Sequence, residues 1–326
     1  MGSYPQTVLV TGGAGFVGSH MAKRLLAEGC NVVIIDNFSS YYEPALKEAR
    51  ISNLLGDSSY QIYRCNIEDF EAVQHIFHEH TIDYVCHLAA QAGVRYSIER
   101  PLVYGSTNII GTLNILELCR QHHVKGLVMA SSSSVYGESD QYPLREDNMT
   151  SCPISLYAAT KRSCELIAYT YHHLYGIPIT CLRYFTVYGP WGRPDMAPFI
   201  FVKNIFDGKP IDVFGRGSMV RDFTYIDDIV EGTYRAIVKN LSWEIVNLGC
   251  GDPKPLNYFI NLIERHAGLV FKKNLIDIQQ GDVRKTHADI SKARELFEWE
   301  PKVSLDEGLK KFVEWYQWFY LKKTPQ

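Results

Sequence analysis

The chain has 326 residues, of which 46% are hydrophobic and 21% are charged, so it can bury the core of one large domain or of two smaller ones. Its formal net charge of −3 argues against general electrostatic binding of nucleic acid or of an anionic membrane. The first residues show no basic leader and no long apolar stretch, so we expect a cytoplasmic protein.

The first half of the chain alternates short β-branched runs with helical stretches. Strands are predicted near residues 6–12, 31–37, 84–90 and 126–130, and helical stretches follow some of them, as at 18–29 and 112–123. Such alternation is typical of a parallel sheet covered on both faces by helices. We therefore predict an α/β fold of the Rossmann type with a doubly wound parallel sheet.

The character of the sequence changes at about Tyr184, where glycine, proline and aromatic residues become frequent. Residues 223–250 then return to the αβ pattern, so we predict two discontinuous domains. Residues 1–183 with about 224–249 would form a cofactor-binding domain, and residues 184–223 with 250–326 would form a smaller, mostly C-terminal substrate domain.

The eight cysteines are scattered, and most of them lie inside apolar segments. This usage is typical of core side chains in a reducing compartment and not of a disulfide framework. No group of cysteine, histidine and acidic residues has the spacing of a structural metal site, so we expect no metal ion.

Three glycines mark a candidate cofactor site. Gly12, Gly15 and Gly18 form G-x-x-G-x-x-G after the first predicted strand and at the start of a predicted helix, where they permit a tight turn and close approach of a diphosphate to the backbone. Asp36 ends the next predicted strand, where a carboxylate accepts hydrogen bonds from the adenosine ribose and repels the extra phosphate of NADP. We therefore predict NAD, with FAD as a minor alternative.

Tyr157 and Lys161 form Y-x-x-x-K within a predicted helix, so both side chains project from one face, one turn apart. A nearby ammonium favours the phenolate form of a tyrosine, which can then act as a general base. The strand at 126–130 ends in four serines, which places Ser132 and Ser134 at the carboxyl edge of the sheet, where ligands bind in this architecture. The spacing of the pair occurs by chance on many helices, but together with the serines it predicts an active site.

Six segments carry a resemblance that covers nearly the whole chain: TGGAGFVGSH, HLAAQAGVRYS, ASSSSVYGE, YAATK, RYFTVYGPWGRPDM and RDFTYIDDIVEG. They resemble the extended short-chain dehydrogenases that act on nucleotide sugars. The resemblance implies that Ser132 orients the substrate hydroxyl, that Tyr157 is the base and then the acid, and that Lys161 assists it, with Ser134 as a second hydroxyl. It also implies a homodimer through the helices at 112–122 and 156–175; packing of the same apolar faces on the sheet is the alternative. The further cofactor contacts that it implies are Phe16, Val17, Asn37, Asn66, Ile67, Leu88, Ala89, Ala90, Tyr157, Lys161 and Tyr184.

The residues before VYG limit which reactions of this family the resemblance implies for the chain. Dehydratases of the family carry an Asp-Glu pair there, and decarboxylases that make UDP-xylose carry a glutamate. In this chain Ser133 and Ser134 occupy those places. Reversible epimerisation of a UDP-sugar at carbon 4, through a transient 4-keto intermediate, is therefore the reaction that the resemblance implies.

Three segments are similar to those of UDP-glucuronate 4-epimerases in particular: residues 37–54 after Asp36, which we interpret as a long loop, FTVYGPWGRPDMAP and QQGDVRKTHADI. In that subfamily Arg193 would face the sugar carboxylate, which a guanidinium can bind at two points; a surface charge or a loop brace is the alternative. The resemblance also implies that Arg221 binds the diphosphate and that Arg95 lines the sugar side. The full set of implied substrate contacts is Arg95, Ser132, Ser134, Thr186, Arg193, Arg221 and Asp282.

Two positions depart from the family pattern. Asn66 stands where many relatives have an aspartate, and Arg284 stands where uronate epimerases usually have proline. Epimerases of UDP-glucose, of UDP-N-acetylglucosamine or of its uronate therefore remain alternatives. An alternative of another class is a non-catalytic NAD-binding regulator on the same fold.

Overall fold

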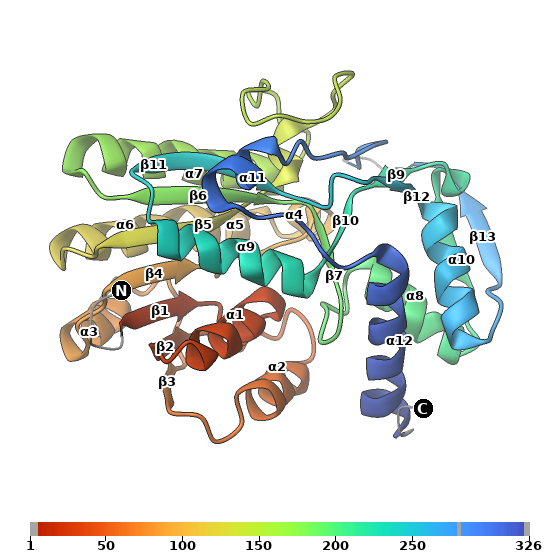
Figure 1. Cartoon of the computed structure of the whole chain (residues 1–326), viewed down its shortest axis with the longest axis horizontal. Coiled ribbons are helices and arrows are strands. Elements are labelled where there is room, and N and C mark those ends of the chain that lie inside the picture. Colours follow the sequence, from red (N-terminus) through yellow and green to blue (C-terminus); the bar gives the residue numbers. More distant parts are fainter. Residues whose placement is uncertain (1–5, 279–281, 323–326) are drawn as a thin grey trace.

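A seven-stranded parallel sheet forms the centre of the molecule, in the order β11–β6–β5–β4–β1–β2–β3 (Figure 1). The computed structural model describes residues 6–278 and 282–322. The predicted Rossmann-type α/β fold is confirmed. The strands are β1 (Thr7–Thr11), β2 (Asn31–Ile35), β3 (Tyr60–Tyr63), β4 (Tyr84–His87), β5 (Gly126–Ser132), β6 (Ile179–Tyr184) and β11 (Trp243–Leu248).

Helices cover both faces of this sheet because side chains alternate along each strand. Val8 and Val10 of β1 pack in one apolar cluster with α1 and α9, whereas Leu9 packs in a second cluster with α3, α6 and α7. The helices on the first face are α1 (Phe16–Ala27), α9 (Ile226–Lys239) and α11 (Ser291–Phe297). Those on the second face are α3 (Phe70–Glu79), α6 (Gly111–Gln121) and α7 (Leu156–Tyr175).

Three helices and three two-stranded sheets build the part of the molecule that Figure 1 shows beyond the carboxyl ends of the strands. Trp315 of the last helix stacks on Phe312 and Phe319, so its aromatic side chains form a core here. The elements are α8 (Ala197–Phe206), α10 (Leu256–Ala267) and α12 (Leu305–Leu321), with β7 (Thr186–Tyr188) paired to β10 (Phe223–Tyr225), β8 (Ile211–Phe214) to β13 (Lys273–Ile276), and β9 (Val220–Arg221) to β12 (Lys254–Pro255).

The stretch after Asp36, interpreted from the sequence as a long loop, contains a helix instead. Helix α2 (Pro44–Arg50) starts with a proline and continues as a π-helical turn through Leu55. Proline fits the first helical turn, and the following Ala-Leu-Lys-Glu-Ala-Arg are good helix formers. Two short helices, α4 (Val94–Glu99) and α5 (Pro101–Tyr104), follow β4. Within the described ranges, no helix has the length and apolar character needed to cross a membrane.

Candidate active site

One cavity of about 460 Å³ opens at the carboxyl ends of the central strands. It brings together the glycine turn, the end of β2, the serines after β5 and the start of α7. The residues predicted from the sequence that line it are Gly12, Gly15, Phe16, Val17, Gly18, Asp36, Asn37, Ile67, Leu88, Ala89, Ala90, Ser132, Ser134, Tyr157, Lys161, Tyr184, Thr186 and Arg193.

The glycine turn leaves no room for side chains. Gly12 has a φ of +70°, and a Cβ on it would lie 2.8 Å from the backbone nitrogen of Ala89. A Cβ on Gly18 would lie 2.1 Å from the carbonyl oxygen of Gly12. Gly15 precedes α1 and offers no side chain to cap it, so the first N–H groups of α1 stay available to an anion. This cradle fits the diphosphate of a dinucleotide.

Asp36 follows β2 and is nearly fully buried. Its carboxylate accepts hydrogen bonds from the backbone N–H groups of Ala14 at 3.1 Å and Phe38 at 2.8 Å, and from Lys47 Nζ at 3.1 Å. The carboxylate therefore holds the glycine turn in place. Lys47 was missed from the sequence, because only the helix after Asp36 brings it back to this carboxylate.

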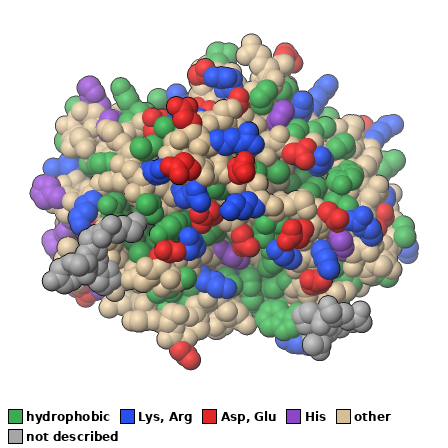
Figure 2. All heavy atoms as spheres, in the orientation of Figure 1, with side chains coloured by type: hydrophobic (Ala, Val, Ile, Leu, Met, Phe, Trp, Pro, Cys, Tyr) green, Lys and Arg blue, Asp and Glu red, His purple; other side chains and the backbone are tan. Residues whose placement is uncertain are grey.

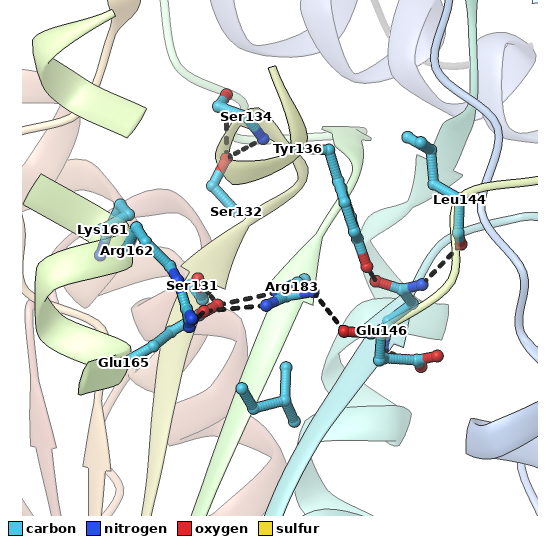
Figure 3. A network of polar contacts seen from close by, with 12 residues as sticks. Ser131, Ser132, Ser134, Tyr136, Leu144, Glu146, Lys161, Arg162, Glu165 and Arg183 are labelled. Carbon is cyan, nitrogen blue, oxygen red and sulfur yellow. Dashed lines mark hydrogen bonds and ion pairs between the residues drawn. The ribbon is translucent and has the colours of Figure 1, made fainter. Parts of the chain in front are cut away.

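Ser134 and Lys161 are hydrogen-bonded to residues at the end of β5. Ser132 Oγ donates to Ser134 Oγ at 3.1 Å and accepts from the Ser134 backbone N–H at 3.2 Å (Figure 3). Lys161 Nζ donates to the carbonyl of Ala130 at 2.8 Å. Tyr157, one turn before Lys161, lies with its ring edge against Tyr104. The sheet edge and the start of α7 thus hold a hydroxyl pair, an ammonium and a phenol around one cavity.

Arg193 lines the cavity and pairs with Asp195, a partner that was not predicted from the sequence. Its Nε and Nη2 donate to the two oxygens of Asp195, at 3.1 and 2.5 Å, and Nη2 also donates to the carbonyl of Ala92 at 3.3 Å. Tyr41 donates its hydroxyl to the same Asp195 carboxylate at 3.0 Å. The R-P-D spacing in the sequence was the available signal for this pair.

Four predicted residues lie outside this cavity. Asn66 is exposed and accepts a hydrogen bond from Asn37 at 2.8 Å. Arg95 is exposed and lies 4.6 Å from the ring centroid of Phe214. The remaining two are bonded to each other, since Arg221 Nη2 donates to Asp282 at 3.1 Å.

Arg50 is fully buried, and no motif in its neighbourhood predicted a role for it. Its guanidinium donates to the carbonyls of Ala14 at 3.2 Å, Trp191 at 2.9 Å and Gly192 at 3.2 Å, and to the Tyr42 hydroxyl at 2.6 Å. Among the described residues, no carboxylate lies within 4 Å of it. Arg50 therefore joins the glycine turn to the segment that carries Arg193.

A second and larger cavity, of about 1080 Å³, lies between α1, α9 and the segment after α11. Charged side chains line most of it, and several pair with one another, as Glu231 does with Arg24 and Arg235. Figure 2 shows basic and acidic side chains interspersed over this face of the molecule. This mixture is typical of a hydrated groove, so we assign the chemistry to the smaller cavity.

Comparisons with known proteins agree with this geometry. The model of a family described as "NAD dependent epimerase/dehydratase family" matches residues 8–249. A UDP-glucuronate 4-epimerase of Thermodesulfobacterium geofontis is 49% identical over 309 residues, which cover 94% of this chain and 95% of that protein. The crystal structure of the UDP-glucuronic acid 4-epimerase from Bacillus cereus in complex with UDP-glucuronic acid and NAD superimposes with a TM-score of 0.91 at 38% identity, covering 97% of this chain and 100% of the other. A UDP-glucose 4-epimerase with UDP-glucose from Thermotoga maritima superimposes with a TM-score of 0.89 at 36% identity, covering 96% and 99%.

Proposed function

The chain belongs to the NAD dependent epimerase/dehydratase family, and from this premise we propose that it interconverts UDP-glucuronate and UDP-galacturonate by epimerisation at carbon 4. It is an isomerase that uses bound NAD. The observation that carries the proposal is the single cavity that the glycine turn, Asp36, Ser132, Tyr157 and Lys161 line together. Such a cavity fits a dinucleotide beside the sugar of a nucleotide-sugar.

The residues around the cavity fit NAD. The glycine cradle and the open N–H groups of α1 would hold its diphosphate, and Asp36 would hold its adenosine ribose. When bound, NAD supplies acceptance and return of a hydride at carbon 4, with a transient 4-keto sugar between the two transfers. The protein residues then have to move a proton and orient the sugar.

Tyr157 takes the proton of the sugar 4-hydroxyl and later returns it. Lys161 stabilises the phenolate by its charge, and Ser132 orients the same hydroxyl by a hydrogen bond. The hydride returns to carbon 4 on the opposite face of the keto sugar, and Tyr157 returns the proton to the oxygen on that carbon. The sugar therefore changes stereochemistry at carbon 4 without a net change in oxidation state.

Arg193 is proposed to hold the carboxylate of the uronic acid. The 4-keto form of a uronic acid is a β-keto acid, which loses carbon dioxide readily, so the site must restrain its carboxylate. Arg193 lines the cavity and can offer two-point binding, and Ser134 stands where a decarboxylase would have a carboxylic acid. Arg95, Arg221 and Asp282 are proposed substrate contacts outside the cavity, with Asn66 as a cofactor contact there.

We further propose a homodimer through α6 and α7. Their outer faces expose large apolar side chains, among which Leu166 is 53% and Tyr169 is 49% exposed. Two adjacent helices with such faces can pair with a second copy of themselves around a two-fold axis.

A cytoplasmic location is proposed because Cys86, Cys119, Cys164 and Cys181 serve as buried core side chains with free thiols.

A product assay tests the function. The purified protein is incubated with NAD and, separately, with UDP-glucuronate, UDP-glucose and UDP-N-acetylglucosamine, and the products are separated by chromatography and identified by NMR. Conversion of UDP-glucuronate alone to its galacto epimer is expected, without substantial UDP-pentose. Turnover of only the neutral sugars would keep the mechanism and overturn the substrate, and a protein that turns over none of them would overturn the proposed function.

A further inference from the structure

A buried ion pair lies next to the serine turn (Figure 3). The Glu165 carboxylate on α7 accepts from Arg183 of β6 at both oxygens, 2.9 Å each, and at most 2% of either side chain is exposed. Burial raises the pKa of the Glu165 carboxyl, but the guanidinium groups of Arg183 and Arg162 and the Ser131 hydroxyl outweigh burial and hold this pKa below its usual value. The pair is therefore charged.

Ser131 joins this pair to the sheet. Its hydroxyl donates to the Glu165 carboxylate at 2.6 Å. Ser131 on β5 and Arg183 on β6 are register partners, which is why both reach one carboxylate from adjacent strands. The next residue of β5 is Ser132, so the contact holds the strand immediately before the hydroxyl that the proposed mechanism uses.

Helix α7 carries the other reacting group. Tyr157, Lys161 and Glu165 follow one another at intervals of four residues, which places them along one face of the helix. Lys161 bonds the carbonyl of Ala130, and Glu165 bonds the side chain of Ser131. Two consecutive turns of α7 thus hold two consecutive residues of β5, and Tyr157 stands one turn before them.

Stability alone is a weak reason to bury such a pair, because well-packed apolar residues in place of a buried ion pair are often neutral or stabilising. We propose that Glu165 and Ser131 are positioning residues: oriented by Arg183, the Glu165 carboxylate holds β5 so that the Ser132 hydroxyl and Tyr157 meet the same substrate hydroxyl. The proposal rests on the proposed function, which gives Ser132 and Tyr157 these roles. Misplacement of reacting groups by about 1 Å can lower a rate by about a hundredfold.

Ser131→Ala is the sharpest test, because it removes the hydrogen bond between β5 and Glu165 and leaves the Glu165–Arg183 pair intact. The kcat for UDP-glucuronate is expected to fall by about 10- to 100-fold. The KM, the amount of NAD bound per protein and the melting temperature are expected to stay close to the wild type. A merely structural role gives the opposite result, with a lower melting temperature and less bound NAD but a normal kcat per NAD-loaded enzyme. That result, or an unchanged kcat, would overturn the proposal.

Arg162→Gln is the matched control, since Arg162 bonds the same Glu165 carboxylate from the partly exposed side of α7, at 2.8 Å. Wild-type kcat is expected. A loss equal to that of Ser131→Ala would assign the effect to the charge of Glu165 and not to its contact with β5, and would overturn the proposal.

A double variant, Ser131→Ala with Glu165→Gln, tests whether the two residues act through one contact. Its kcat is expected to equal that of the slower single variant, because the second change removes nothing further. Multiplied losses would show independent effects and contradict the proposal. If Glu165→Gln does not fold, Ser131→Ala and its control decide the matter alone.

The proposed function can be wrong while the positioning role is right. A wild-type protein that is inactive on every UDP-sugar would show that the function is wrong. Crystal structures of the wild type and Ser131→Ala would then decide the positioning role. A Ser132 side chain displaced from Tyr157 in the variant supports it, and an unchanged arrangement refutes it.

Discussion

The two sides of the cavity differ in how their polar groups are partnered. On the glycine-turn side, which comprises Gly12–Gly18, Asp36, Ser132, Tyr157 and Lys161, the Asp36 carboxylate is held by the chain itself and the N–H groups of α1 remain available. On the arginine side, which comprises Arg193, the guanidinium already has a carboxylate partner, Asp195, as Arg221 outside the cavity has Asp282. A ligand can therefore add contacts on the first side, whereas an anion has to compete with a carboxylate on the second.

Tyr157→Phe tests the glycine-turn side and should have the largest effect. It removes the general base without touching the cradle, so kcat should fall by about 10²- to 10⁴-fold while NAD stays bound. The product assay gives the rate, and the absorbance spectrum of the purified variant gives the bound NAD. Tyr258→Phe, which changes an exposed tyrosine on α10, should behave as the wild type. Normal turnover in Tyr157→Phe would show that the mechanism is wrong.

Arg193→Ala tests the arginine side. If Arg193 holds the sugar carboxylate, kcat/KM for UDP-glucuronate should fall by about 10- to 100-fold, the worth of one or two hydrogen bonds to a charged group. Turnover of UDP-glucose, which has no carboxylate, should change much less. Equal losses on both substrates in parallel steady-state assays would mean that Arg193 only braces its loop.

Asp195→Asn tests the same side of the cavity. It keeps Arg193 but removes the negative charge of Asp195, which competes with the substrate carboxylate for the guanidinium. The KM for UDP-glucuronate should fall if the carboxylate competes with the substrate. If the KM for UDP-glucuronate instead rises as much in Asp195→Asn as in Arg193→Ala, then Asp195 orients the guanidinium for binding.

Arg50→Lys tests the link between the two sides. An ammonium keeps the charge but cannot reach the four oxygens that the guanidinium bonds, so buried carbonyls lose their donors. The free energy of unfolding in urea should fall by about 2 kcal/mol or more, and the KM for UDP-glucuronate should rise as the segment of Arg193 loosens. Arg64→Lys, at an exposed position, is the control. An equal loss of unfolding free energy in both variants would show that the buried contacts of Arg50 do not link the two sides.

The smallest effect concerns pH and the buried imidazole of His87, which bonds Thr11 at 2.7 Å and Thr112 at 3.0 Å. Burial, and secondarily the Lys161 charge, lower its pKa from 6.5 to about 3. Between these values the unfolded chain binds a proton that the folded chain does not, so His87 reduces stability as the pH falls from 6.5 towards 3. In His87→Gln the slope of unfolding free energy against pH should be shallower by about 1.4 kcal/mol per pH unit near pH 5. Urea titrations across that range would measure it, and parallel slopes would show that His87 is charged when folded.

Local sequence was sufficient to predict the glycine-turn side. Gly12 and Gly18 are needed because a Cβ would strike the backbone of the same turn or of the segment after β4, which pairs with β1. Tyr157 and Lys161 share a face because of helical periodicity. Such constraints are local, so they can be recognised from the sequence alone. The alternation of strands and helices is also a local pattern, and it predicted that the sheet is parallel and covered by helices on both faces.

The partners of these residues could not be predicted in the same way. Lys47 reaches Asp36 only because α2 folds back, and Arg50 meets Trp191 across 141 positions of sequence. Arg183 and Glu165 lie on different elements, and only the packing of α7 against β6 brings them together. Contacts of this kind depend on tertiary packing, which residue spacing does not encode.

The place of β11 in the sheet also bears on how the chain folds during synthesis. β11 pairs with β6, but 58 residues separate Tyr184 from Trp243, and they include α8 and the strands β7 to β10. The edge of the sheet therefore stays open until the ribosome has made that whole intervening stretch, because a parallel strand cannot pair before it exists. Until then β6 presents unpaired backbone groups, which are a template for wrong pairing between nascent chains. Completion of the sheet is thus a late, non-local step, of the kind that slows folding and exposes a protein to aggregation.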